Sequence, residues 1–150
     1  MSTGPLPRSW LFVPADSERK LARALDAGAD AVILDLEDAV VPGRKLLARQ
    51  MASAFLRAAA GSTRPSLWVR VNPLSSGLMH DDLRAVLPAA PAGIMLPKPD
   101  SIADVRELDR ALGDLRATGV QMFSNVAGRP LDLPEFQPIF ARMAERRLPI

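Results

Sequence analysis

The sequence predicts an α/β fold in which about five parallel strands alternate with helices. Apolar runs of strand length alternate with amphipathic segments from residue 9 to the end of the chain, and strands joined through helices pair in parallel by right-handed crossovers. Two architectures fit this order, a (β/α)8 barrel and a doubly wound sheet. The first strand is followed by PADSE, and the sequence contains no GxGxxG or GxxxxGK[ST] motif. Nucleotide binding of those kinds therefore has little support.

Two strand–helix units precede residue 61. SWLFVP (9–14) predicts a strand, with Asp16 as the candidate N-cap of the next helix and Gly28 at the end of that helix. AVILDLE (31–37) predicts the second strand, and a long helix follows from about Gly43. The apolar stripes expected on these two helices are Leu21 with Leu25, and Leu47 with Met51 and Phe55.

The pattern repeats after a return loop at 61–65. SLWVRVNP (66–73) predicts the third strand and GIMLPKP (93–99) the fourth, with a short helix over 81–90 between them.

The last part of the chain predicts helix, strand and helix. Apolar residues three or four apart predict a helix over 102–115, and VQMFSN (120–125) predicts a fifth strand. The final helix is expected to carry Phe136, Ile139, Phe140 and Met143. With 150 residues the chain is short for a complete barrel, which typically needs about 250. We therefore expect a single, incomplete domain over 1–150.

Composition excludes several classes of function. The net charge is +2 with 24% charged residues, and no run of five or six basic residues marks a nucleic-acid site. The absence of cysteine excludes disulfides, thiolate metal sites and a cysteine nucleophile. No stretch of 18 apolar residues and no signal-peptide pattern is found. We expect a cytoplasmic protein without membrane or nucleic-acid partners.

Polar side chains gather where the predicted strands end. Because side chains alternate across a strand, Asp35 and Glu37 share one face of the second strand, and Arg70 and Asn72 share one face of the third. The direction of Lys98 does not follow from this alternation, because Lys98 is in phase with the apolar Ile94 and Leu96. In a barrel these ends surround the active site, and the candidate site residues are Asp35, Glu37, Asp38, Arg70, Asn72 and Lys98.

Three clustered carboxylates need cations or water, because burying an unpaired charge costs several kcal/mol. Arg70 and Lys98 are the expected partners, and Mg²⁺ is another, since it prefers carboxylates, waters and a substrate oxygen. The alternative is purely structural: Asp35 pairs with Arg70, Asp38 caps the next turn, and nothing is catalysed. His80 is expected in a surface loop. No HxH, HExxH or GxSxG motif is present, so a histidine metal site and a hydrolase elbow lack support.

A family resemblance rests on five motifs in this order: RSWLFVPADSERKLARAL, GADAVILDLEDAVVPGRKLLAR, WVRVNP, DDL and GIMLPKPDS. Over about 8–112 the chain closely resembles the citrate lyase β-subunit-like group of the HpcH/HpaI aldolase family. The resemblance favours the (β/α)8 barrel, here in partial form. It implies a carbon–carbon lyase that acts on a small carboxylate, a 2-keto or hydroxy acid, or an acyl-CoA with Mg²⁺.

The resemblance also implies roles for individual residues. Arg70 would hold the substrate carboxylate or carbonyl oxygen and act as a catalytic residue together with Glu37 and Asp38. Those two acids would lie beside the metal and its waters. Lys98 would lie at the same mouth. Family members take their direct metal ligands from a glutamate at the end of the fifth strand and a later aspartate, and the fifth strand here, VQMFSNVAGRPLD, has no glutamate at that point.

The segment 119–150 resembles part of an amidohydrolase-related metal-dependent hydrolase or decarboxylase. This predicts a join of two barrel fragments near 113–119. A half-barrel would expose strand edges and an apolar inner face, so we expect homo-oligomers. Two alternatives to the lyase stay open: a non-catalytic structural or assembly module, and an amidohydrolase-type activity.

Overall fold

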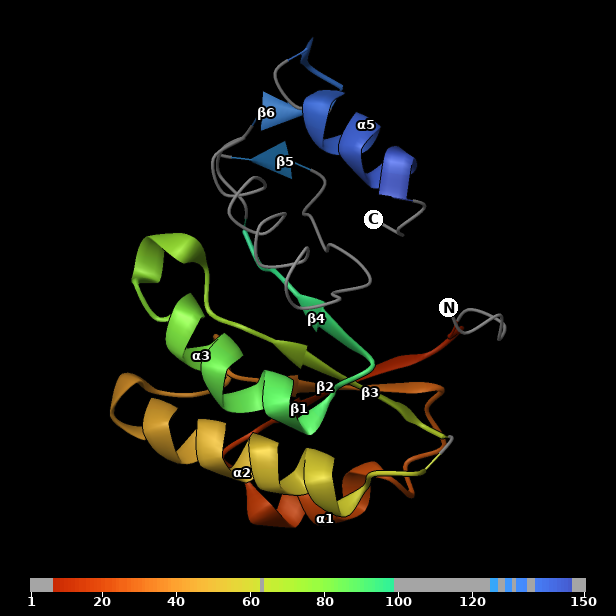
Figure 1. The fold of residues 1–150 in the computed structure, drawn as a ribbon, viewed down its shortest axis with the longest axis vertical. Coiled ribbons are helices and arrows are strands. Elements are labelled where there is room, and N and C mark those ends of the chain that lie inside the picture. Colours follow the sequence, from red (N-terminus) through yellow and green to blue (C-terminus); the bar gives the residue numbers. More distant parts are fainter. Residues whose placement is uncertain are drawn as a thin grey trace.

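A four-stranded parallel sheet forms the centre of the computed structural model, which describes residues 7–62, 64–98, 125–126, 129–130, 132–134 and 137–146 (Figure 1). The strands follow the order of the chain: β1 (Trp10–Pro14), β2 (Ala31–Asp35), β3 (Ser66–Arg70) and β4 (Gly93–Met95). They confirm the first four predicted strands, although the last three end two to four residues earlier than expected.

The register aligns the carboxyl ends of all four strands. Pro14 pairs with Asp35, Asp35 with Arg70, and Arg70 with Met95. Residues that follow these positions in the chain therefore meet at one edge of the sheet.

Three helices cover one side of the sheet in Figure 1: α1 (Glu18–Ala24), α2 (Lys45–Ala58) and α3 (Met79–Val86). Short 3₁₀ helices η1 (Pro42–Arg44), η2 (Leu74–Ser76) and η3 (Leu87–Ala89) flank them. The core lies between sheet and helices, where Leu34, Val69 and Ile94 from the strands cluster with buried helix residues such as Leu21 and Leu83. A barrel wall has its helices on one face of a parallel sheet, whereas a doubly wound sheet has helices on both faces. The arrangement seen here is that of a barrel wall.

Two details of the predicted helices are corrected. Leu47 is 40% exposed, and the face of α2 that enters the core carries Ala48, Ala52 and Leu56. Alanine lets a helix backbone approach its neighbour closely, so side-chain size did not identify the buried stripe. Met51 and Phe55 pack at the edge of the core, as expected.

The first helix also begins differently from the prediction. Ser17 occupies the N-cap position of α1 without a side-chain hydrogen bond, and Leu25 is 39% exposed. Asp16 Oδ2 instead accepts a hydrogen bond from Arg44 Nε at 2.6 Å. A distant guanidinium has replaced the local cap that the sequence suggested, because a charged partner is the stronger donor.

The end of the chain contains β5 (Asn125–Val126), β6 (Arg129–Pro130) and α5 (Gln137–Arg146). The helix α5 confirms the predicted final helix at Ile139, Phe140 and Met143, whereas Phe136 lies outside the described residues. Of the predicted fifth strand only Asn125 is described, and there β5 pairs antiparallel with β6. The predicted helix over 102–115 lies outside the described residues. Among the described helices none is long and apolar enough to cross a membrane.

Candidate functional site

Asp35 organises the backbone at the end of β2. Its side chain is 1% exposed, and its two oxygens accept hydrogen bonds from the amides of Glu37 at 2.8 Å and Ala39 at 3.2 Å. The turn is therefore capped by Asp35, whereas the structural alternative assigned this role to Asp38. The backbone leaves the strand directly after Asp35, which brings its carboxylate within reach of both amides.

Arg70 joins the acids of β2 to the end of β3. Its Nε and Nη2 donate to the two oxygens of Asp35 at 2.9 and 2.6 Å, and its Nη1 lies 3.0 Å from Glu37 Oε2. The guanidinium carbon lies 4.8 Å from the centre of the Phe12 ring, a cation–π distance. Burial alone would lower the pKa of Arg70, but the hydrogen bond to Asp35 and the nearby acids outweigh it and raise that pKa.

Lys98 completes the group from beyond β4. Its Nζ lies 2.8 Å from Glu37 Oε1 and donates to Asp38 at 3.0 and 2.9 Å. The contact with Glu37, followed by that with Asp38, raises the pKa of Lys98, and the hydrogen bond from Lys98 lowers the pKa of Asp38. Lys98 has φ +48°. This left-handed backbone is uncommon outside glycine and explains why strand alternation could not orient the side chain.

Five of the six predicted residues thus form one group, which we call the strand-end cluster: Asp35, Glu37, Asp38, Arg70 and Lys98. The structural pairing of Asp35 with Arg70 is confirmed, and so is the convergence on which the catalytic hypothesis depends. Their functional roles stay predictions. Within the described part of the chain, Glu37 is the member whose two oxygens lack a well-aligned hydrogen bond, although Lys98 Nζ and Arg70 Nη1 pair with them at 2.8 and 3.0 Å.

Asn72 points away from this cluster into a second group, the helix-side network, made of Lys45, Arg49, Asn72 and Asp82. The backbone N and Nδ2 of Asn72 donate to Asp82 Oδ2, both at 2.7 Å. Its Oδ1 accepts from Lys45 Nζ at 2.7 Å, and Arg49 Nε donates to Asp82 Oδ1 at 2.7 Å. The chain has left β3 at Arg70, so the alternation that pairs Asn72 with Arg70 no longer applies.

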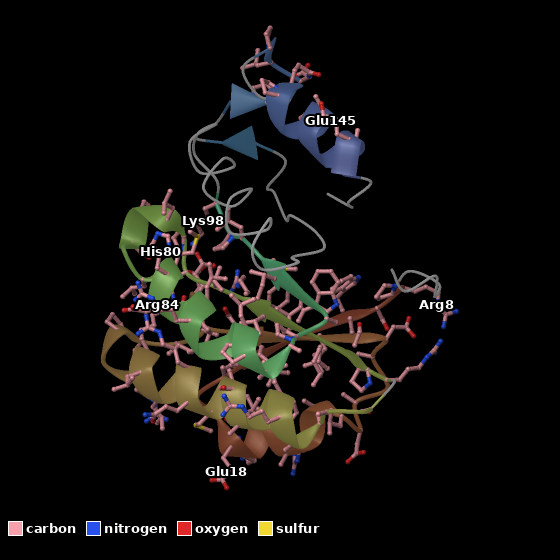
Figure 2. All side chains as sticks on the ribbon, viewed as in Figure 1. Arg8, Glu18, His80, Arg84, Lys98 and Glu145 are labelled. Carbon is pink, nitrogen blue, oxygen red and sulfur yellow. The ribbon has the colours of Figure 1, made fainter. Side chains whose placement is uncertain are left out.

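Sequence reasoning missed Lys45, Arg49 and Asp82. One signal was available for Lys45: a positive charge in the first turn of a helix opposes the helix dipole, so a lysine at that position indicates an interaction outside the helix. Burial lowers the pKa of Lys45 against the opposing charges of Asp82 and the strand-end acids. His80, two residues before Asp82 in the chain, was expected in a surface loop. It is exposed, as expected, but lies on α3 and not in a loop (Figure 2).

A magnesium ion fits this site only in part. The buried Glu37 carboxylate has two oxygens without a well-aligned hydrogen bond, and each of them also faces a cation, Lys98 at 2.8 Å and Arg70 at 3.0 Å. Within residues 7–62, 64–98 and the described parts of 125–146, however, no three His, Cys, Asp or Glu side chains are placed to hold a metal ion. The described acids therefore do not make up a complete set of direct ligands for a Mg²⁺ ion.

Fold and site together define a class of protein: a βα-barrel wall with paired acids and cations gathered at its strand ends. The HpcH/HpaI aldolase/citrate lyase family matches residues 8–131, and the chain belongs to this family.

Named relatives agree with this assignment. The chain is 36% identical to a (3S)-malyl-CoA thioesterase of Cereibacter sphaeroides over 108 residues, which are 72% of this chain and 38% of the relative. It superposes with a TM-score of 0.52 and 41% identity on the citrate lyase β subunit of Mycobacterium tuberculosis complexed with oxaloacetate and magnesium, over 66% of this chain and 42% of that one.

A further M. tuberculosis structure contains protein CitE with magnesium, acetoacetate and coenzyme A. It has the same TM-score of 0.52 and 41% identity, over 66% of this chain and 35% of that one. The chain thus spans about two fifths or less of the relatives named here, with 38% for the thioesterase. Homologues bind magnesium together with small carboxylates, and one of them also binds coenzyme A.

The family match corrects the expected origin of the C-terminal part. It runs to residue 131, through the junction predicted near 113–119. The comparisons give no support to an amidohydrolase-like segment over 119–150, and an amidohydrolase-type activity is not proposed. Short strand–helix segments of different barrel families share the same apolar periodicity, so a resemblance without metal ligands did not discriminate between them.

Proposed function

We propose that this chain supplies part of a Mg²⁺-dependent carbon–carbon lyase site for a small 2-keto or hydroxy acid or its CoA thioester. The observation that supports it most directly is the position of Arg70, at the carboxyl end of β3 and 15% exposed. Within the described part of the chain, Nε and Nη2 of Arg70 each donate to Asp35, and Nη1 forms an ion pair with Glu37 Oε2 at 3.0 Å. Even when one N–H is counted for that ion pair, two of the five N–H donors of an arginine are left for a ligand.

In this proposal Arg70 binds the substrate carboxylate or carbonyl oxygen. Asp35 holds the guanidinium plane through two hydrogen bonds, so that Arg70 is oriented before the ligand arrives. Lys98 is 39% exposed and adds a second cation at the mouth. Asn72 is buried and would support the site from behind rather than contact the substrate.

Glu37 and Asp38 would accept hydrogen bonds from water around a magnesium ion. When bound there, the ion would supply positive charge to the substrate carbonyl. Cleaving a bond next to a carbonyl leaves an enolate, and cations placed in advance lower the barrier by stabilising the developing charge. Removing one such group typically costs about 10²–10³ in rate, and Arg70 is the residue to which we assign that effect.

The test is the thermal unfolding of the 150-residue chain with MgCl₂ and oxaloacetate. A ligand at 100 times its Kd stabilises a protein by about 2.7 kcal/mol, which raises Tm by roughly 5–10 °C at this size. Arg70→Ala should abolish this shift. Arg70→Lys, which keeps the charge and part of the pairing with Asp35, should reduce it.

Arg84→Ala is the matched control, because Arg84 is 78% exposed and pairs with Asp81 away from the cluster. It should leave the shift unchanged. If wild type shows no shift at millimolar magnesium and oxaloacetate, this chain alone does not form the site.

A second function, that of an assembly module, is favoured by the face of the sheet opposite the helices. Trp10 and Phe12 are each 41% exposed, and Trp10 contacts Trp68 edge-to-face with ring centres 5.0 Å apart. Exposed aromatic side chains of this size on one face mark an interaction surface.

We propose that 1–150 forms a single, incomplete barrel domain that self-associates. Light scattering should show a dimer or larger species, which Phe12→Ser weakens; a monomer at all concentrations would exclude it.

A further inference from the structure

We infer that Lys45 is a positioning residue of the site, which fixes the backbone from which Glu37 enters the strand-end cluster. The effect of Lys45 on ligand binding rests on the proposed function, but its role in holding the main chain can be tested without any ligand.

The contacts of Lys45 are unusual for a lysine beside four acids. Its Nζ donates to the carbonyl oxygens of Leu36 at 2.6 Å and Glu37 at 2.7 Å and to Asn72 Oδ1 at 2.7 Å. An ammonium group has three N–H donors, so all three are used on uncharged acceptors. Lys45 therefore acts as a clamp on the main chain at the end of β2.

The position of Lys45 in the fold makes this clamp possible. It is the first residue of α2, and its side chain crosses from the helix to two strand ends, since Asn72 follows β3 and Leu36 follows β2. Asn72 Nδ2 also donates to the Leu36 carbonyl at 2.9 Å. The Leu36 oxygen thus receives two donors, and the separation of the two strand ends is set from the helix side.

Glu37 depends on such a clamp more than its neighbours do. Its side chain is 4% exposed, and within the described residues neither oxygen takes part in a hydrogen bond. Ion pairs attract without strict direction, whereas hydrogen bonds orient. The directional contacts of this residue are therefore in its backbone: the amide donates to Asp35 at 2.8 Å, and the carbonyl accepts from Val40 N at 3.1 Å and from Lys45.

Hydrogen exchange of the 150-residue chain tests the clamp without ligand. Lys45→Met keeps much of the side-chain volume but removes the three donors. We expect the exchange rates of the Glu37, Ala39 and Val40 amides to increase at least about tenfold more than those of other amides. This is the factor expected for one lost hydrogen bond from a charged donor. Leu21→Ala, on the buried face of α1, is the control for general destabilisation and should raise exchange without this local excess.

A second measurement separates this inference from the proposed function. If wild type is stabilised by magnesium and oxaloacetate, Lys45→Met should lose most of the shift in Tm, while Leu21→Ala should keep it despite a lower Tm. If wild type shows no shift, the proposed function fails for this chain, and exchange alone decides the role of Lys45. Equal exchange at Glu37–Val40 in Lys45→Met and Leu21→Ala would overturn the inference.

Discussion

The strand-end cluster and the helix-side network lie close together but differ in how their buried acids are held. In the helix-side network the central acid Asp82 is 0% exposed and accepts three hydrogen bonds, two from Asn72 and one from Arg49. In the strand-end cluster the buried acid Glu37 accepts no side-chain hydrogen bond from the described residues, while Asp38 is 62% and Lys98 39% exposed.

This difference indicates which group serves the fold and which serves a ligand. A buried polar network whose members are all satisfied specifies one packing arrangement. Glu37 is held by two ion pairs, to Lys98 and Arg70, without a well-aligned hydrogen bond, and a buried carboxylate of this kind calls for an explanation such as a bound ion, water or ligand. We therefore expect substitutions in the helix-side network to change stability, and those in the strand-end cluster to change ligand response.

The largest effect is expected for Asp82→Ala. It leaves the Arg49 guanidinium, 12% exposed, and the Asn72 amide without their shared acceptor, and breaking a buried pair in this way costs about 3–5 kcal/mol. Urea unfolding measures the loss. Asp81→Ala is the control, since Asp81 is 52% exposed and its pairs should contribute no more than about 1 kcal/mol. Similar small losses for both variants would contradict the structural role of the network.

Glu37→Gln should have a small effect on stability and a large one on binding. The amide keeps the shape and removes a buried charge, whose desolvation roughly offsets its attraction to cations, so we expect a change of about 1 kcal/mol or less. The rise in Tm with magnesium and oxaloacetate should disappear. Glu18→Gln, on the exposed start of α1, should change neither quantity. A loss as large as that of Asp82→Ala would make the strand-end cluster structural as well.

The smallest effect is expected for Lys98→Met and depends on pH. The pKa of Lys98 is raised from 10.5 in the folded chain, so its contribution is fully present below 10.5 and is lost as pH rises through the raised value. Because the side chain is 39% exposed, we expect no more than about 1 kcal/mol at neutral pH.

The part of this contribution that comes from Asp38 is lost in acid, because the pKa of Asp38 is lowered from 3.8. That part is present above 3.8 and is lost as pH falls through the lowered value. Wild type and Lys98→Met should thus differ in unfolding free energy at neutral pH, differ less in acid, and converge above the raised pKa of Lys98. A difference that persists well above pH 10.5 would show that Lys98 acts through packing rather than charge.

Much of the site followed from strand alternation. Asp35 and Arg70 occupy paired positions in register, and their side chains form the predicted ion pair. Alternation holds as long as the backbone stays extended, and it failed where the strands end: Asn72 turns toward α3, and Lys98 reaches the cluster from a left-handed backbone.

The amino-acid sequence by itself determined the order of strands and helices, the parallel sheet and the gathering of acids and cations at one edge, because apolar periodicity and the alternation of side chains are local properties. Only the tertiary structure decided which helix residue lies behind which strand end. The clamp of Lys45 on Leu36 and Glu37 and the burial of Asp82 against Asn72 depend on how α2 and α3 pack on the sheet. Contacts of this kind join residues that no local pattern relates.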